Sequence, residues 1–142
     1  MSGTSRRSEI VRQIEATGVV AVIRLTDASQ LSAVAGALLA GGVRALEVTM
    51  TVPRAVPLIE ELAATLPADV LVGAGTVLDA DTARHVILAG ARFVVGPVFR
   101  REVIEACHRY DVAVMPGCFT PTEILAAWDA GATPVVVLTK AD

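Results

Sequence analysis

Short valine-rich apolar runs alternate along this chain with longer segments of helical period. Each run is nearly continuous in apolar character, which predicts parallel strands covered on both faces. The predicted strands are Val19 to Leu25, Ala45 to Thr51, Val70 to Val77, Phe93 to Phe99, Val112 to Gly117 and Pro134 to Leu138. The predicted helices between them are Ala28 to Ala40, Pro53 to Leu66, Asp81 to Ala89, Arg101 to Tyr110 and Pro121 to Ala130. The repeat predicts one βα unit after another.

Capping residues support these boundaries. The expected helix starts are Asp27 or Ser29, Thr51 before Pro53, Asp79, and Thr120 before Pro121, with Glu123 as the capping-box partner of Thr120. The expected stops are Leu39-Ala40-Gly41-Gly42, Leu88-Ala89-Gly90-Ala91 and Asp129-Ala130-Gly131-Ala132. Each stop ends a helix on glycine and leads into the next strand.

Length and composition exclude several classes of protein. The length of 142 residues predicts one domain, 1–142. Its amino-terminal segment, 1–18, is expected to cap one end of the domain with an amphipathic helix over Ser8 to Thr17. Apolar residues make up 54%, and the net charge of -3 has no acidic or basic blocks, which argues against disorder, nucleic-acid binding and membrane binding. Cys107 and Cys118 lack metal-site spacing, so we expect reduced thiols in a cytoplasmic protein without a metal or cofactor.

Polar residues within the second predicted strand favour a barrel over an open sheet. Glu47, Thr49 and Thr51 share one parity, and the residues between them are apolar. Since side chains alternate between the two faces of a strand, one face is wholly polar and carries a carboxylate at mid-strand. A barrel interior that opens at the carboxyl ends of the strands accommodates such a face. Arg24 and Thr76 should converge on the same mouth.

Glu47 is the strongest candidate for chemistry. A carboxylate between apolar neighbours is either paired with a cation, here Arg24, or held with a shifted pKa for proton transfer. Arg24 is in turn either a solvated strand-end residue or a clamp for a carboxylate or phosphate. The Gly73-Ala74-Gly75-Thr76 strand end indicates either close strand packing or backbone that makes room for a substrate.

Several of these segments, in order and with matching spacing, resemble the family that cleaves 2-keto-3-deoxy-6-phosphogluconate (KDPG) and 4-hydroxy-2-oxoglutarate (KHG). The resemblance runs from about Val19 to Gly131. Its segments are Val20-Ala21-Val22-Ile23-Arg24, Gly41-Gly42-Val43-Arg44-Ala45-Leu46-Glu47-Val48-Thr49, Val72-Gly73-Ala74-Gly75-Thr76-Val77, Gly96-Pro97, Met115-Pro116-Gly117 and Thr120-Pro121-Thr122-Glu123.

The resemblance implies a (β/α)8 barrel and a class I aldolase. Such an enzyme cleaves a 2-keto-4-hydroxy acid to pyruvate and an aldehyde through a Schiff base, without a metal. Glu47 matches the residue that carries protons during carbinolamine formation and carbon–carbon cleavage. Arg24, Thr51, Thr76 and Pro97 match positions near the keto-acid site. The family usually assembles as a homotrimer.

The sixth strand departs from the family pattern. There a lysine, followed by an apolar pair and a proline, forms the Schiff base with the substrate ketone. Counting from Ala130-Gly131, that position falls on Val136, which cannot form an imine. Lys140 is the catalytic candidate out of register, since it shares the strand parity of Val136 but lies about 13 Å further along an extended strand.

The resemblance ends with this strand, so we expect only the first five and a half βα units of the barrel. Six parallel strands cannot close an eight-stranded barrel. A truncated or frameshifted product, an engineered piece, and a shortened homologue that covers its edges by association all remain open. Two alternatives to the aldolase also remain: an inactive homologue that acts as an oligomeric scaffold, and a decarboxylase or epimerase that uses Glu47.

Overall fold

The computed structural model describes residues 5–132 and 134–137 of the chain. Six parallel strands form one half-barrel sheet in the order β1-β2-β3-β4-β5-β6. The strands are β1 (Ala21–Ile23), β2 (Ala45–Thr49), β3 (Leu71–Gly75), β4 (Phe93–Gly96), β5 (Ala113–Cys118) and β6 (Val136–Val137). The helices are α1 (Arg6–Thr17), α2 (Leu31–Ala40), α3 (Ala55–Thr65), α4 (Ala80–Leu88), α5 (Arg101–Arg109) and α6 (Pro121–Asp129), and a 3-10 turn η1 (Ala28–Gln30) precedes α2. The predicted alternation of strands and helices is therefore confirmed.

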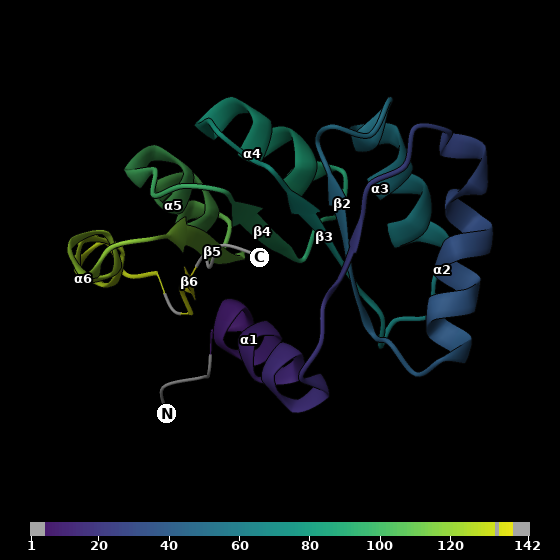
Figure 1. Ribbon diagram of the computed structural model, residues 1–142, viewed down its shortest axis with the longest axis horizontal. Helices are drawn as coiled ribbons and strands as arrows, with labels where there is room; N and C mark the ends of the chain where they lie inside the picture. Colours follow the sequence, from purple (N-terminus) through teal and green to yellow (C-terminus); the bar gives the residue numbers. More distant parts are fainter. Residues whose placement is uncertain (1–4, 133, 138–142) are drawn as a thin grey trace.

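The strands follow an arc in which each one pairs with its neighbour in sequence. Helices α2 to α6 lie along the outer side of this arc, and α1 lies on the inner side (Figure 1). Because all the strands are parallel and sequential, their carboxyl ends meet at one rim of the sheet. Side chains that follow different strands are thereby brought to the same place.

Each face of the sheet has its own hydrophobic core. The outward residues of the strands, among them Leu46, Val48 and Val94, belong to the large core that the outer helices cover. The inward residues at the strand starts, such as Leu71 and Phe93, form a second, smaller core. Glu47 and Thr49 share the parity of this inner face, since the register places Glu47 beside Gly73 and Gly73 beside Phe93. The predicted shared face is confirmed for Glu47 and Thr49, whereas Thr51 lies beyond the end of β2.

Helix α1 closes the amino-terminal end of the inner face. Its Ile10 is 1% exposed and packs with Leu71 and Phe93, while Val11 and Ile14 flank the same core. The helix begins at Ser5, whose side chain accepts a hydrogen bond from the backbone of Ser8. The predicted capping helix is therefore present, and it fills the base of the sheet with apolar side chains.

Two of the four expected helix starts are confirmed, whereas α2 begins after Gln30, which supplies no side-chain cap. Asp79 accepts from the Thr82 amide at 2.7 Å, and Thr120 and Glu123 form the predicted capping box. Three predicted glycine stops are also present: Gly42, Gly90 and Gly131 have φ values of 90°, 105° and 86°. Left-handed backbone of this kind lets a helix end and turn toward the next strand.

The expected start of α3 was wrong. Thr51 and Pro53 lie in a turn after β2, and the helix begins only at Ala55. Arg54 precedes it with a φ of 59°, so the chain passes through a left-handed residue before it becomes helical. The second strand accordingly ends at Thr49, two residues before its predicted end.

The sixth strand is only partly described. Val136 pairs with Gly117 and Val137 with Cys118, which continues the parallel sheet beyond β5. Lys140 lies outside the described residues, as does Leu138, the predicted end of this strand.

Candidate active site

A cavity of about 340 Å³ lies on the inner side of the sheet, toward the carboxyl ends of its strands. Its wall is formed by residues of β1, β2, β4, β5 and β6, by the residue just before β1, and by residues that follow β1, β3 and β4. The lining residues are Val20, Val22, Arg24, Glu47, Thr76, Val95, Gly96, Pro97, Met115 and Val136. This is the end of a parallel barrel at which substrates bind and side chains from several strands converge.

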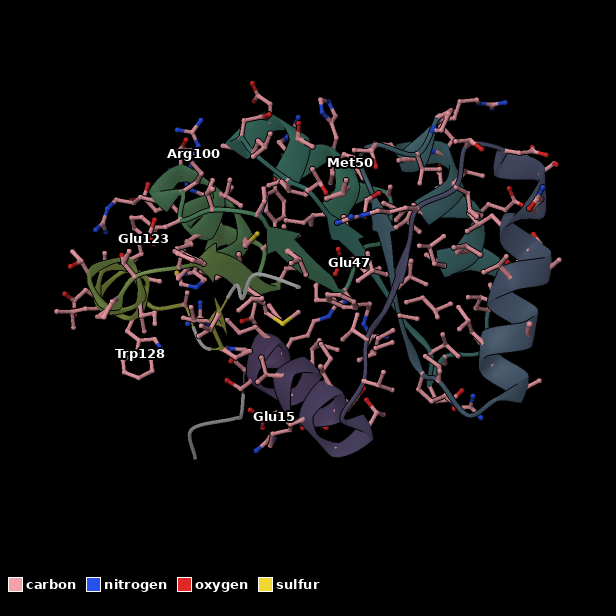
Figure 2. The ribbon with its side chains drawn as sticks, viewed as in Figure 1. Glu15, Glu47, Met50, Arg100, Glu123 and Trp128 are labelled. Atoms are coloured by element: carbon pink, nitrogen blue, oxygen red, sulfur yellow. The ribbon has the colours of Figure 1, made fainter. Side chains whose placement is uncertain are left out.

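Glu47 is held in the middle of β2, between β1 and β3. It pairs in register with Val22 on one side and with Gly73 on the other, and it is 7% exposed. The carboxylate fits because Gly75 has no side chain: a Cβ at that position would overlap the Glu47 carboxyl group. Figure 2 shows Glu47 within the arc of strands. Gly75 therefore makes room for the carboxylate itself.

Two opposing effects set the ionisation of Glu47. Burial raises its pKa above the ordinary value of 4.5, and the positive charge of Arg24 partly lowers it again. The carboxylate and the guanidinium form no ion pair within 4.0 Å in the described part of the chain. Arg24 is exposed at the end of β1 and acts on Glu47 through its charge. A carboxyl group with a raised pKa exchanges protons more readily near neutral pH.

Thr76 lies in the cavity wall with a backbone that β-branched residues rarely adopt. Its φ is 60°, in the left-handed region. Hydrogen bonds on both sides fix this conformation: Gly75 O accepts from the Met50 amide at 2.9 Å, and the Val77 amide donates to Val95 O at 3.2 Å. Backbone strain that neighbouring bonds enforce in this way is concentrated at functional sites.

The structure brings most of the predicted site residues together. Arg24, Glu47, Thr76 and Pro97 all line the cavity, whereas Thr51 does not. The Thr51 hydroxyl instead forms a 2.7 Å hydrogen bond with the hydroxyl of buried Thr49.

Val136, the position that matches the family lysine, lines the same cavity as Glu47. Gly117, its partner in β5, packs closely on the neighbouring turn, since a Cβ there would lie 2.5 Å from the Pro97 carbonyl oxygen. The pairing of β6 with β5 therefore places residue 136 in the wall of the cavity around Glu47.

Sequence reasoning missed the apolar part of the wall. Val20, Val22, Val95 and Met115 line the cavity, and none of them was predicted as a site residue. The signal was present, because Met115 and Val95 have the inward parity of Phe93 and Ala113.

Within residues 5–132 and 134–137, no three His, Cys, Asp or Glu side chains are grouped so as to hold a metal ion. In the same ranges, no helix combines the length and the apolar character that crossing a membrane requires.

Comparison with known proteins agrees with this geometry. The KDPG and KHG aldolase family model matches residues 10–139. The 2-dehydro-3-deoxy-phosphogluconate aldolase of Treponema pallidum (strain Nichols) is 39% identical over 129 residues, which cover 89% of this chain and 59% of that protein. The chain therefore spans about three fifths of the length of this relative.

Solved structures show the same fold. One described as "Native KDPGal structure" superposes with a TM-score of 0.81 at 29% identity, covering 86% of this chain and 59% of the other. The KDPG aldolase of Legionella pneumophila, with pyruvate captured as a covalent carbinolamine intermediate, gives a TM-score of 0.79 at 33% identity, covering 85% and 58%. The chain belongs to the KDPG and KHG aldolase family.

Proposed function

We propose that this chain is an aldehyde-lyase that cleaves a 2-keto-4-hydroxy acid to pyruvate and an aldehyde. The observation that carries the proposal is the position of Glu47, a buried carboxyl group with a raised pKa in a cavity that it shares with Arg24. Family membership over most of the chain supports the same reaction. The Legionella relative holds pyruvate as a carbinolamine, which forms when an amine adds to the ketone.

Arg24 is proposed to hold the substrate carboxylate, since a guanidinium at the cavity rim supplies paired donors to such a group. Thr76, Pro97 and Thr51 are proposed to complete the binding site, with Thr51 acting through its hydrogen bond to Thr49. The apolar wall would contact the substrate carbon chain.

Glu47 is proposed to carry protons through the reaction. When an amine adds to C2 of the substrate, protonation by Glu47 lets the carbinolamine oxygen leave as water and gives an imine. The resulting Glu47 carboxylate then accepts the C4 hydroxyl proton while the C3–C4 bond breaks. The aldehyde leaves, and the electron pair of that bond forms an enamine. Protonation at C3 and addition of water release pyruvate and the free amine.

Lys140 is the proposed amine, because it is the single lysine of the chain. The residue that lines the cavity at the expected position is Val136, which has no nucleophile. For Lys140 to act, the segment after Val137 must return its side chain to the cavity. A covalent adduct of Lys140 with a keto acid would therefore show directly that this side chain reaches the ketone.

Borohydride trapping tests the proposal. The chain is incubated with pyruvate and reduced, and its intact mass and peptide map are measured. We expect one reduced pyruvate per chain on Lys140, and Lys140→Arg should abolish it while leaving the fold unchanged by circular dichroism. A chain that forms no adduct would contradict the lyase proposal. If that chain is also a monodisperse oligomer, the non-catalytic scaffold becomes the better account.

We propose that residues 1–142 are one domain, that the six strands are the first part of an eight-stranded barrel, and that the protein forms a homotrimer. The exposed Leu125 and Trp128, three residues apart on α6, support association, and Trp128 projects from the outer side of the molecule (Figure 2). The free, buried Cys107 and Cys118 support a cytoplasmic location. Light scattering on the purified chain measures the oligomeric state.

A further inference from the structure

A second cavity, of about 410 Å³, lies at the opposite end of the sheet from Glu47. The carboxyl-terminal half of α1 borders it with Gln13, and the segments that enter β2, β3 and β4 border it with Arg44, Asp69 and Arg92. It shares no lining residue with the cavity around Glu47. We call it the basal cavity.

Arg44 is largely occupied by contacts within the protein. Its Nη1 atom donates to the Leu39 carbonyl at 2.9 Å and to the Val43 carbonyl at 3.3 Å, at the end of α2. Its Nε atom lies 3.3 Å from an Asp69 carboxylate oxygen. Asp69 is thereby held at the rim of the basal cavity as the partner of Arg44.

Arg92 differs from Arg44, because its Nε atom is buried and has no hydrogen-bond partner among the described residues. The pKa of Arg92 is lowered first by burial and then by the positive charge of Arg6. A guanidinium nevertheless stays protonated in proteins, so a buried charged donor lacks an acceptor. Carboxylate and phosphate oxygens are the acceptors that match its paired N–H groups.

We propose that the basal cavity binds a small oxyanion, a carboxylate or a phosphate, with Arg92 as its main ligand and Arg44 at its rim. Two arginines face one aspartate there, so the cavity carries net positive charge. An anion whose oxygens accept hydrogen bonds from the Arg92 guanidinium at the cavity wall reduces the repulsion between Arg92 and Arg6. Because this site is separate from the Glu47 cavity, its occupant stabilises the folded chain without competing for the keto acid.

Isothermal titration calorimetry with inorganic phosphate, and separately with malonate, tests this site at an ionic strength held constant with sodium chloride. We expect saturable binding at the basal cavity for at least one of the two anions. Arg92→Met should weaken binding about tenfold or more, since it removes a charge-assisted contact. Asp69→Asn should tighten anion binding, because Asp69 is the only acidic residue among the described residues that line the basal cavity.

Two control variants locate the binding. Arg12→Met makes the same substitution at an exposed α1 residue that pairs with Glu9, and it should bind as the unchanged chain does. Arg24→Gln removes the cation of the cavity around Glu47, where a carboxylate is also proposed to bind, and the binding that Arg92→Met weakens should persist in this variant. The proposal is overturned if neither anion binds, if Arg92→Met binds normally, or if Arg24→Gln abolishes binding. If Arg92→Met fails to fold, an unchanged affinity in Asp69→Asn overturns it.

Discussion

The carboxylate of Glu47 and the missing side chain of Gly75 depend on each other. A Cβ at position 75 would occupy the space of the Glu47 carboxyl group, so Gly75→Ala should push this carboxyl group out of its place. We expect the variant to fold and to lose most of the pyruvate trapping, roughly 100-fold, the scale of acid–base catalysis by one group. The rate of borohydride-trapped adduct formation measures this effect.

The matched control for this substitution is Gly36→Ala. Gly36 lies inside α2, and an added Cβ would meet no atom within 4 Å. It should leave trapping unchanged and stabilise the fold by about 0.5–1 kcal/mol, since alanine favours a helix over glycine. Equal trapping rates in the two alanine variants would contradict the positioning role of Gly75.

The raised pKa of Glu47 also predicts how stability depends on pH. Burial makes the folded chain hold this proton more tightly than the unfolded chain, so the contribution of Glu47 to stability is complete below pH 4.5 and decreases as pH rises through its folded pKa. Glu47→Gln, which cannot ionise, should therefore be more stable than the unchanged chain at pH 7. The difference should vanish near pH 4. Urea unfolding at both pH values measures it.

Glu15→Gln provides the comparison for this experiment, because Glu15 is an exposed residue of α1 (Figure 2). Its effect on the free energy of unfolding should be small at both pH values. A Glu47→Gln difference that is the same at pH 4 and pH 7 would show that lost packing, rather than ionisation, sets the effect.

At the scale of the elements, α2 ends with two adjacent glycines, of which only the second has a left-handed backbone. Gly41 has a φ of -78°, which any residue adopts, and Gly42 has a φ of 90°. An added Cβ meets only ordinary contacts at Gly41 and nothing within 4 Å at Gly42. Gly41→Ala should therefore leave the free energy of unfolding within about 0.5 kcal/mol. Gly42→Ala should lower it by about 1–2 kcal/mol through backbone strain alone.

Urea unfolding of the two variants measures this difference. Since neither substitution creates a clash, equal stabilities would mean that α2 can end without a left-handed residue.

Element order and the glycine stops could be predicted because periodicity and capping chemistry act over a few neighbouring residues. The end of α5 was predicted to within one residue, but the left-handed residue that follows it was not, since it is Asp111, with a φ of 52°, and not a glycine. Its carboxylate accepts a 2.7 Å hydrogen bond from the Arg6 amide, 105 residues away. The turn at Thr51 also escaped prediction, although its hydrogen bonds are local: the Val52 amide donates to Thr49 O, and the Thr51 hydroxyl pairs with the Thr49 hydroxyl. Thr51 before Pro53 has the sequence pattern of a helix cap, which hid this turn.

At the scale of the whole molecule, the site exists only because six consecutive strands lie in order. Arg24, Glu47, Thr76 and Pro97 follow or occupy four different strands. The first three were predictable from their places on the strands, whereas Pro97 was expected only from the family resemblance. The apolar wall could have been found from the inward parity of Val95 and Met115. The basal cavity could not be predicted, since it depends on which faces the curved sheet encloses. Helix α1 lies at the amino end of this sheet, where Ile10 packs on the strand starts and Gln13 borders the basal cavity.

The same arrangement makes the sixth strand a direct test of the architecture. Val136 lines the cavity with Glu47, whereas Val137 points from the opposite face of β6 and is 57% exposed. In a Lys140→Arg background, Val136→Lys should place the single lysine of the chain within the cavity, and Val137→Lys should place it outside. Borohydride with pyruvate should trap an adduct in the first variant and none in the second.

Glu47 should govern the rate of that new reaction. Because dehydration of a carbinolamine needs a proton donor, Glu47→Gln in the Val136→Lys chain should slow trapping roughly 100-fold. Comparable adducts at 136 and 137 would mean that the lysine reacts as a free surface amine, and that β6 does not place residue 136 beside Glu47. Trapping at position 136 that depends on Glu47 would instead show that the described strands already supply the acid–base half of an aldolase site.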